Sequence, residues 1–421
     1  MIIRDRSAGL FVGHMIILPI ASLVAFVVYL QHPQVNLSTN LYAPLPMVAS
    51  LWATHIACTL FLVYHPIQFN ESHLSIVLVA LSISLAASVL IIFLSRVHYS
   101  LGFLLTFFLI VWPWATWQHR KMAHHYKNLN FGIAKTGGWQ TVKQFDADHI
   151  DFIDEPARFD TTRHAALVID DSVPVPDSWA EFISRALGSG TEVISLARFF
   201  ELYSGRVLLE TWASPSLDQN GPNSLYLVLK RLIDIVVSGA LLVGTFPLII
   251  LCLIAIRLGS PGNPLYIQTR IGRYGKHFRL YKLRTMRLGA ESNGPRFASS
   301  QDPRVTRFGT FLRRTKMDEW PQFLNVLRGD MSLVGPRPER PEWIEQFRKE
   351  LPYYELRHVV CPGITGWAQI TDGYASNIDE TRRKLERDLF YIRHISLSLD
   401  IAILFRTIPV LGKGFTLGDF R

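Results

Sequence analysis

The chain has 421 residues, which is long enough for two or three domains, and 49% of them are hydrophobic. That apolar share, with a positive mean hydropathy, indicates contact with a membrane. The formal net charge of +9 suits anionic lipid head groups and phosphorylated substrates as well as it suits nucleic acid. The three cysteines lie far apart, at positions 58, 252 and 361, which excludes a disulfide framework and a CxxC metal site.

Four apolar segments precede residue 118, and they cover 11–30, 45–64, 75–95 and 102–117. The first three are long enough to cross a hydrocarbon core, and the fourth is shorter but ends in a belt of tryptophans. Arginines precede the first segment, and the basic run HRKMAHHYK (119–127) follows the fourth. An even number of spans places both basic clusters on one side, which the positive-inside rule makes cytoplasmic. We therefore predict four transmembrane helices in residues 1–118 and no cleaved signal peptide.

Residues 128–220 have the composition of a soluble domain. HAALVIDD (164–171) predicts a buried strand, SWAEFISRALGSG (178–190) a helix closed by glycine, and TEVISL (191–196) a second strand. This succession is a βαβ unit, so we predict a small Rossmann-like domain here. The glycine pair of KTGGW (135–139) lacks the GxGxxG pattern, which favours a structural or regulatory role over dinucleotide binding. LDQNGPNS (217–224) is typical of a linker.

The next apolar run lies between Lys230 and Arg257 and is long enough to span the membrane. A fifth spanning helix would carry the basic remainder of the chain to the outer side, against the positive-inside rule. Pro247 lies in the middle of the run, removes a backbone donor and kinks a helix. We therefore predict a re-entrant helix at 232–256 that enters the cytoplasmic leaflet and returns, with a spanning helix as the alternative.

The stretch TKMDEWPQF (315–323) places two adjacent carboxylates, Asp318 and Glu319, after a cationic run. Acids in the first turn of a helix are stabilised by the helix dipole, and that structural explanation suffices for the stretch alone. Further polar motifs surround it, in YIQTRIGRYGKHFRLYKLRTM (266–286), RVTRFGTFLRRTKMDEWPQFLNVLRGDMSLVGPRPER (304–340) and PGITGWAQI (362–370). With these motifs around it, the acid pair is better explained by function than by helix stabilisation alone.

Residues 225–421 resemble the bacterial sugar transferase family, the polyprenyl-phosphate glycosyl-1-phosphate transferases. Five motifs occur in the family's order, namely KRxxD, QxRxG, KxRTM, DEWPQxxNVLxGDMSxVGPRP and PGITGWAQ. With the four preceding spans and the soluble insert, the chain is similar to the larger members that initiate exopolysaccharide, O-antigen or capsule repeat units. The expected fold class is therefore a membrane α-helical protein combined with α/β, in which a mostly helical catalytic domain faces the cytoplasm at the bacterial inner membrane.

The resemblance implies that a sugar 1-phosphate passes from a UDP-sugar to undecaprenyl (polyprenyl) phosphate, with release of UMP. Asp318 matches the nucleophile of the family, which forms a covalent phosphosugar intermediate, and Glu319 would act as a metal ligand or base. Mg²⁺ held partly by both carboxylates is the expected cofactor, because it binds a carboxylate or two together with substrate phosphates. The expected phosphate-binding residues are Arg313, Lys282, Arg284, Arg337 and Arg270. Trp320 and Trp367 are expected in the core or at the membrane interface.

Two departures from the family pattern affect details. Many members have Asp-Ala-Glu after the RTM motif, whereas this chain has Gly289-Ala290-Glu291, so the aspartate's role is absent or passes to Glu291. The helix break is often Ser-Pro and is Phe246-Pro247 here, so we expect the hydroxyl of Thr245 to satisfy freed backbone groups. The stretch 385–414 is apolar with charged interruptions and predicts an interfacial amphipathic helix.

Other classes of function remain as alternatives. A transporter is disfavoured because the four spans contain almost no ionisable residues beyond His14 and His55. A nucleic-acid partner is not expected, since no docking motif is present. A non-catalytic scaffold and a direct attack by the lipid phosphate, without a covalent intermediate, stay open. The transferred sugar is also open, and the expected partners are the UDP-sugar, the polyprenyl phosphate, membrane lipids and a second copy in a homodimer.

Overall fold

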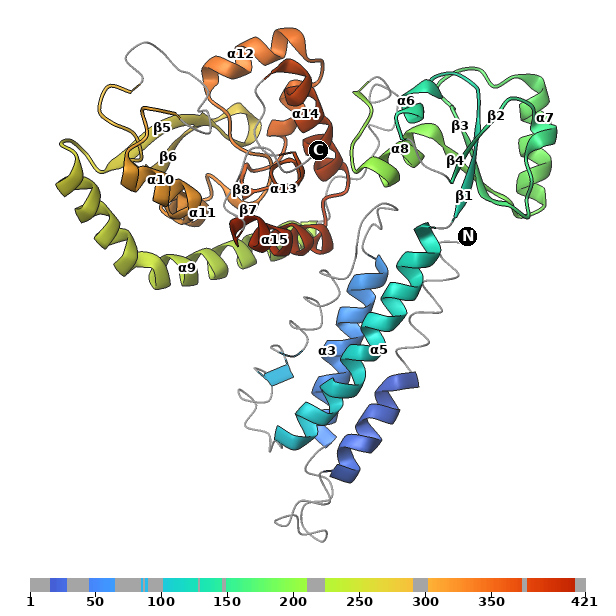
Figure 1. Ribbon diagram of the computed structural model, residues 1–421, viewed down its shortest axis with the longest axis horizontal. Helices are drawn as coiled ribbons and strands as arrows, with labels where there is room; N and C mark the ends of the chain where they lie inside the picture. Colours follow the sequence, from blue (N-terminus) through green and yellow to red (C-terminus); the bar gives the residue numbers. More distant parts are fainter. Residues whose placement is uncertain are drawn as a thin grey trace. The chain divides into compact units, whose positions relative to one another are not determined.

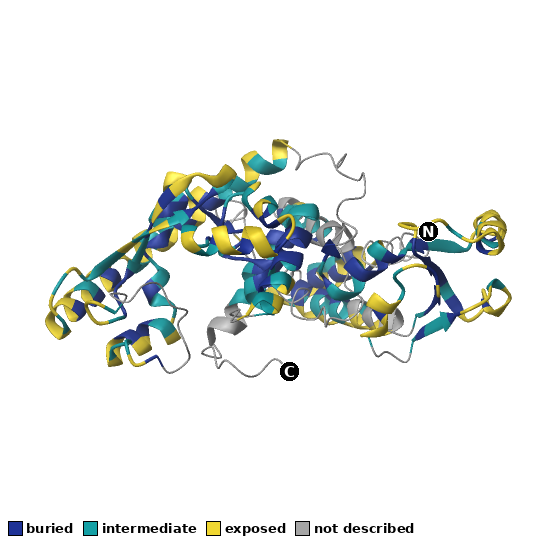
Figure 2. Cartoon of the chain, turned by 90° about the horizontal axis from the view of Figure 1, so that it is seen from above, coloured by how far each residue is buried: buried dark blue, intermediate teal, exposed yellow. Residues whose placement is uncertain are grey.

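The computed structural model describes residues 16–28, 45–64, 85, 88–89, 101–127, 129–145, 149–209, 224–290, 302–372 and 377–412. The chain divides into two compact units, Met1–Ser204 and Gly205–Arg421 (Figure 1). Buried residues concentrate on the inner sides of the elements, and exposed residues lie on their outer sides (Figure 2).

The first part of the first unit is a group of apolar helices. They are residues 16–28, α3 (Leu45–Tyr64) and α5 (Leu101–Lys127). Leu18, Leu51 and Phe107 are fully buried between them, while Leu23 and Leu109 on the outer faces are exposed. Helices that are apolar on both faces are typical of membrane spans. The third predicted span, 75–95, lies almost entirely outside the described residues, so the four-span arrangement stays a prediction.

The second part of the first unit is a parallel sheet with strand order β2-β1-β3-β4. The strands are β1 (Asn130–Ala134), β2 (Ile150–Ile153), β3 (His164–Ile169) and β4 (Glu192–Ser195). The helices around it are α6 (Gln140–Lys143), η1 (Pro156–Arg158), α7 (Asp177–Gly188) and α8 (Leu196–Ser204). Successive strand residues alternate between the two faces, so Val168 packs with Phe199 of α8 and Leu167 packs with Trp179 of α7. The predicted βαβ unit is confirmed.

The glycine pair after β1 lies where the strand order of this sheet reverses, between β1 and β3. In such folds that position is the usual place for a ligand's phosphates. Here the buried carboxylate of Asp170 accepts a hydrogen bond from Gly138 N at 2.6 Å and also binds Ser172. Gly137 has a positive φ of 55°, and a Cβ there would overlap Asp170. The chain's own carboxylate thus fills this position, which supports a structural or regulatory role over dinucleotide binding.

The second unit starts at Gly205, contains the long helix α9 (Ser224–Gly259) and is mostly helical, as predicted. Two short sheets stand among its helices. They are an antiparallel pair, β5 (Leu265–Ile271) with β6 (His277–Leu283), and a parallel pair, β7 (Ser332–Val334) with β8 (Gly363–Thr365). The remaining helices are η4 (Arg273–Gly275), α10 (Arg307–Arg314), η5 (Met317–Glu319), α11 (Gln322–Arg328), α12 (Pro341–Glu350), η6 (Tyr354–His358), α13 (Trp367–Thr371), α14 (Ile378–Arg393) and α15 (Leu397–Gly412).

The charged residues of the KRxxD motif fasten the first half of α9 to this unit. Lys230 Nζ donates to Asp400 Oδ2 at 2.6 Å, and Asp234 Oδ1 accepts from Leu333 N at 2.9 Å. Arg231 donates to the carbonyl oxygens of the last turn of α11, at 2.6 and 2.8 Å. The motif is therefore structural, because each of its three charged side chains has a partner on another element.

The second half of α9 packs on the same unit through different residues. Ile249, Cys252 and Ile256 form a small apolar cluster with Leu283 of β6 and Leu312 of α10. Figure 1 shows that α9 bends along its length, and Pro247 lies inside it. Among the described residues, α9 is the one helix long and apolar enough to cross a membrane.

The expectation for Thr245 is wrong in its detail. Its hydroxyl donates to Leu241 O at 2.7 Å, whereas the carbonyl that Pro247 leaves without its usual donor is that of Val243. Such a bond to the preceding turn bends a helix without repairing the break. Thr245 therefore adds to the bend of α9.

The stretch 385–414 is also corrected. The stretch forms the C-terminal part of α14 and, after a short break, the whole of α15, which ends at Gly412. Two helices therefore take the place of the single interfacial helix that was predicted. The apolar side chains of Leu389, Phe390 and Ile403 lie in the main core of the unit. The sequence misled because an apolar face that covers a protein core has the same pattern as one that covers lipid.

Residues 205–209 enter this core although they precede the expected start of the domain at residue 225. Val207 and Leu209 are 0% and 2% exposed and belong to the main core. Trp367, which is buried as expected, donates from Nε1 to Gly205 O at 2.8 Å. Val207 N donates to Glu386 O at 3.2 Å. The segment is thus a packed part of the second unit.

Leu209→Ala should lower the free energy of unfolding by roughly 2–5 kcal/mol, because it leaves a cavity in a closed core. Leu288→Ala removes a side chain that is 58% exposed and should change that free energy by less than about 0.5 kcal/mol. Thermal denaturation of the full chain in detergent compares the two variants. Equal midpoints would show that residues 205–209 only pass along the surface of the unit.

Candidate active site

Close backbone contacts between β7 and β8 form the frame of the site. Gly335, Gly363 and Gly366 lie so near one another that a Cβ on any of them would come within 3.0 Å of backbone atoms of the facing segment. Gly335 N donates to Thr365 O, and Gly363 N donates to Pro336 O. The motifs VGPRP and PGITGW therefore require glycine at these positions, and together they fix the chain that leads into Arg337.

The acid pair occupies a short turn between α10 and α11. Lys316, which precedes it, has a left-handed backbone with φ of 57°, and Asp318 and Glu319 fall in the single 3-10 turn η5. The pair therefore lies before the first turn of α11, which begins at Gln322. Stabilisation by a helix dipole does not account for it.

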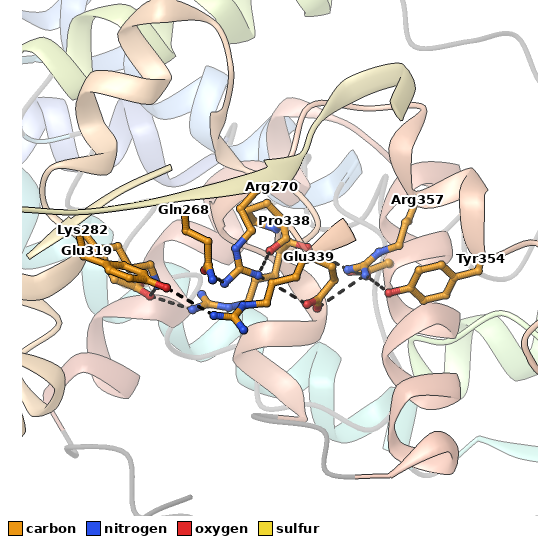
Figure 3. A network of polar contacts seen from close by, with 12 residues as sticks. Gln268, Arg270, Lys282, Glu319, Pro338, Glu339, Tyr354 and Arg357 are labelled. Atoms are coloured by element: carbon orange, nitrogen blue, oxygen red, sulfur yellow. Dashed lines mark hydrogen bonds and ion pairs between the residues drawn. The ribbon is translucent and has the colours of Figure 1, made fainter. Parts of the chain in front are cut away.

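Glu319 is held by two cations from different elements. Its Oε1 accepts from Lys282 Nζ of β6 at 3.0 Å (Figure 3). The same oxygen accepts from Arg337 Nη2 at 2.8 Å. Burial by itself would raise the pKa of Glu319, but Lys282, Arg337 and Lys316 outweigh it and hold that pKa well below the usual range. The Glu319 carboxylate is thus ionised at neutral pH.

Asp318 is in the opposite electrostatic situation. It is 7% exposed, and its Oδ1 has no hydrogen-bond partner among the described residues. Burial, and after it the negative charge of Glu319, raise the pKa of Asp318 to about 6, against the opposing effect of nearby cations. A buried carboxylate with an unpaired oxygen costs stability, and such exceptions are typical of functional sites.

The other predicted phosphate ligands are held in three different ways. Arg313 Nε donates to Thr285 Oγ1 at 2.9 Å. Arg284 Nη2 donates to Ser260 O, just beyond the end of α9, at 2.8 Å. Arg270 donates to Pro338 O at 3.0 Å and to Gln268 Oε1 at 2.8 Å, and burial lowers its pKa to about 10 (Figure 3).

Of the predicted phosphate ligands, Lys282 and Arg337 thus contact the acid pair directly, through Glu319. The hydrogen bonds of Arg284 and Arg270 go instead to backbone carbonyls and to Gln268. Their guanidinium groups hold the chain around the site, and direct phosphate contacts by them stay a prediction.

A buried ion pair that the sequence did not reveal supports Arg337 from behind. Arg357 Nη2 donates to Arg337 O at 3.0 Å and to Asp388 Oδ2 at 2.8 Å, and its Nη1 donates to Tyr354 OH at 2.6 Å. Both Arg357 and Asp388 are buried, and burial raises the pKa of Asp388 to about 6 although Arg357 opposes the shift. In the sequence, Asp388 was visible only as an interruption of an apolar stretch.

The residues at the acid pair fit Mg²⁺. That ion takes one or two carboxylates and completes its shell with phosphate oxygens and water, and Asp318 Oδ1 is an oxygen without another partner in the described chain. No group of three or more histidine, cysteine, aspartate or glutamate side chains that could hold a metal occurs in the described ranges. A site that depends on substrate phosphates as further ligands does not need one.

Comparison with known proteins now decides the family. The model of the bacterial sugar transferase family matches residues 225–414. UDP-N-acetylgalactosamine-undecaprenyl-phosphate N-acetylgalactosaminephosphotransferase of Aeromonas hydrophila is 36% identical over 295 residues, which are 70% of this chain and 70% of the relative. The chain belongs to the bacterial sugar transferase family.

Other relatives of this sugar transferase match a shorter part of the chain. UDP-glucose:undecaprenyl-phosphate glucose-1-phosphate transferase of Escherichia coli is 44% identical over 190 residues, which are 45% of this chain and 40% of that protein. The enzyme of the same name from Caulobacter vibrioides is 44% identical over 187 residues, or 43% of this chain and 69% of the relative. The acid pair and all five motifs lie in the region that the family model covers.

The raised pKa of Asp318 predicts that this residue destabilises the folded protein. A carboxyl group whose folded-state pKa lies above its unfolded value costs stability once it ionises, so the penalty is absent below about pH 4 and complete above about pH 6. Its size is about 3 kcal/mol. Asp318→Asn should therefore raise the thermal midpoint at pH 8, and the gain should shrink as the pH falls to 5.

Asp171→Asn is the matched control, because the Asp171 side chain is exposed, and it should leave the midpoint unchanged at both pH values. Differential scanning calorimetry of the full chain makes the comparison. If Asp318→Asn were less stable than the wild type at pH 8, the ionised carboxylate would stabilise the fold, which would contradict the raised pKa of Asp318.

Proposed function

We propose that this protein transfers a sugar 1-phosphate from a UDP-sugar to undecaprenyl phosphate and releases UMP, and that this step initiates the repeat unit of a bacterial polysaccharide. The observation that carries the proposal is the buried Asp318 carboxylate, whose free oxygen lies beside a glutamate fixed by two cations. The names of the relatives support the substrate classes, since they specify UDP-sugars and undecaprenyl phosphate.

In the proposed first step, an oxygen of Asp318 attacks the phosphorus that carries the sugar. The bond from that phosphorus to the oxygen of the UMP group breaks, and UMP leaves with the electron pair. The product is an acyl phosphate in which the phosphosugar is bound to Asp318. A pKa of about 6 favours this role, because at neutral pH the carboxylate is ionised and yet more basic than an ordinary aspartate.

In the second step, a phosphate oxygen of undecaprenyl phosphate attacks the same phosphorus, and the Asp318 carboxylate leaves unchanged. Both steps bring an anion to an anion, so positive charge must surround the phosphorus. Lys282 and Arg337, which are both hydrogen-bonded to Glu319, supply positive charge beside Asp318. Arg313 supplies more, because its two terminal nitrogens have no hydrogen-bond partners in the described chain. Mg²⁺, when held by Asp318 and Glu319, would neutralise phosphate charge at the same place.

The anchoring of α9 supports the re-entrant arrangement. A straight helix of 36 residues is about 54 Å long, far more than the roughly 30 Å of a hydrocarbon core, so a spanning α9 would place its two ends on opposite sides. Arg231 and Asp234 instead bind α11 and β7, while Cys252 and Ile256 pack on β6 and α10 of the same unit. We therefore propose that α9 enters and leaves the cytoplasmic leaflet, and that the catalytic unit lies on the cytoplasmic face of the inner membrane. A homodimer remains a prediction.

A transfer without a covalent intermediate is the second candidate, because the same cations would also neutralise a direct attack by the lipid phosphate. A non-catalytic scaffold is the third, and the intact acid pair disfavours it. The three candidates differ in what happens when the donor is present and the lipid acceptor is not.

Incubation of the purified full chain with Mg²⁺ and either UDP-glucose or UDP-N-acetylgalactosamine, without lipid, should add the mass of one phosphosugar. The adduct should be absent from Asp318→Asn, since the amide cannot act as the nucleophile. Intact-mass spectrometry detects the adduct, and the donor that forms it identifies the sugar. UMP released only after addition of undecaprenyl phosphate, with no adduct, would establish direct transfer, and no UMP in any condition would rule out the proposed reaction with these donors.

Cysteine labelling tests the re-entrant helix. In a variant that lacks the three native cysteines, Ser224→Cys and Pro261→Cys place one thiol at each end of α9, where both native side chains are exposed. In sealed inside-out vesicles, a membrane-impermeant maleimide should label both thiols to the same extent, because both ends face the cytoplasm. Labelling of one thiol alone, with the other reached only after detergent is added, would establish a spanning helix.

A further inference from the structure

Thr285 of the KxRTM motif lies at the junction between β6 and α10. It is 7% exposed, and its backbone carbonyl accepts hydrogen bonds from Thr306 N at 3.0 Å and from Thr306 Oγ1 at 3.3 Å. A Cβ on Gly309 would overlap that same carbonyl. The first turn of α10 therefore rests directly on the backbone of Thr285.

The side chain of Thr285 contacts the other end of the same helix. Its Oγ1 accepts a hydrogen bond from Nε of Arg313, in the last turn of α10, at 2.9 Å. Arg313 has no other side-chain hydrogen bond within the described chain, so Nη1 and Nη2 are the two nitrogens left for a ligand. These two nitrogens form the fork that matches two oxygens of a phosphate group.

The orientation of Arg313 matters because of what lies next to it. Arg313 lies in the last turn of α10, and α10 packs against the turn η5 that holds Asp318. Leu312, its neighbour in α10, is fully buried in the cluster that includes Met317 and Trp320, on either side of the acid pair. Helix α10 thus has a fixed position relative to Asp318.

We propose that Thr285 is a positioning residue whose hydroxyl holds Nε of Arg313, so that the two terminal nitrogens of the guanidinium face the phosphoryl group of the donor at Asp318. The inference rests on the proposed function, because it requires a phosphate beside Asp318. A purely structural role, in which Thr285 only supports α10, is the competing explanation. The backbone of Thr285 performs that structural role, whereas its hydroxyl bonds, among the described residues, to Arg313 alone.

Thr285→Val keeps the shape of the side chain and removes the acceptor, and Thr285→Ser keeps the acceptor. Loss of a hydrogen bond to a charged group at this position should lower kcat/KM for UMP release by roughly 10- to 100-fold in Thr285→Val. Thr285→Ser should retain most of the activity. Thr310→Val, in which the hydroxyl lost is exposed on the same helix, is the matched control and should behave as the wild type.

A double mutant separates positioning from support. In an Arg313→Ala background, Thr285→Val should cause no additional loss, because its target is already absent. A merely structural role of Thr285 would add a further loss of activity in that background.

Equal losses in Thr285→Val and Thr285→Ser, or full additivity with Arg313→Ala, would overturn the inference while leaving the proposed function intact. A wild type that releases no UMP would overturn the proposed function, and the inference with it. The thermal midpoints of all variants are measured in parallel, and a loss of activity in Thr285→Val that merely follows a fall in its midpoint counts against positioning.

Discussion

The ion pairs of Glu319 with Lys282 and Arg337 are the interaction on which the rest of the site depends. Two carboxylates in one buried turn repel each other, and without compensation one of them would take up a proton. The two cations fix the negative charge on Glu319, so that protonation is confined to Asp318. They also join three separate parts of the chain, since Lys282 comes from β6, Glu319 from η5 and Arg337 from the loop after β7.

Each of these three parts is held by a different physical device. The loop of Arg337 is set by glycines that allow backbone to touch backbone, and by Arg357, which binds its carbonyl from behind. The turn of the acid pair begins at a residue with left-handed backbone and is flanked by the buried cluster around Leu312. Strand β6 is fixed by its pairing with β5. The acid pair therefore gains its geometry from rigid supports. The packing around it offsets the free-energy cost of its buried charge.

The sequence located the cluster of charged side chains better than it located the residues that support the cluster. Asp318, Glu319, Lys282 and Arg337 were assigned through the order of the motifs, and the structure brings these four side chains together. The pairs Lys230 with Asp400 and Arg357 with Asp388 were not predicted, because partners separated by long stretches of chain leave no local pattern. In the sequence these aspartates only interrupted apolar runs, which made 385–414 look like an interfacial helix. The role of Arg284 as a phosphate ligand stays a prediction, whereas its hydrogen bond to the carbonyl of Ser260 was not visible in the sequence.

The dipeptide Arg284-Thr285 connects the end of the apolar helix α9 with α10. Arg284 donates to the carbonyl of Ser260, directly after the apolar helix α9, while Thr285 binds both ends of α10. A continuous path of hydrogen bonds and one peptide unit thus runs from the end of α9 to the guanidinium of Arg313. Both supports are short and buried, so α9 and Arg313 are held in one fixed relation. In the proposed transfer, a soluble donor and a lipid acceptor would meet at one phosphorus atom, and a fixed relation between the apolar helix α9 and Arg313 would suit that meeting.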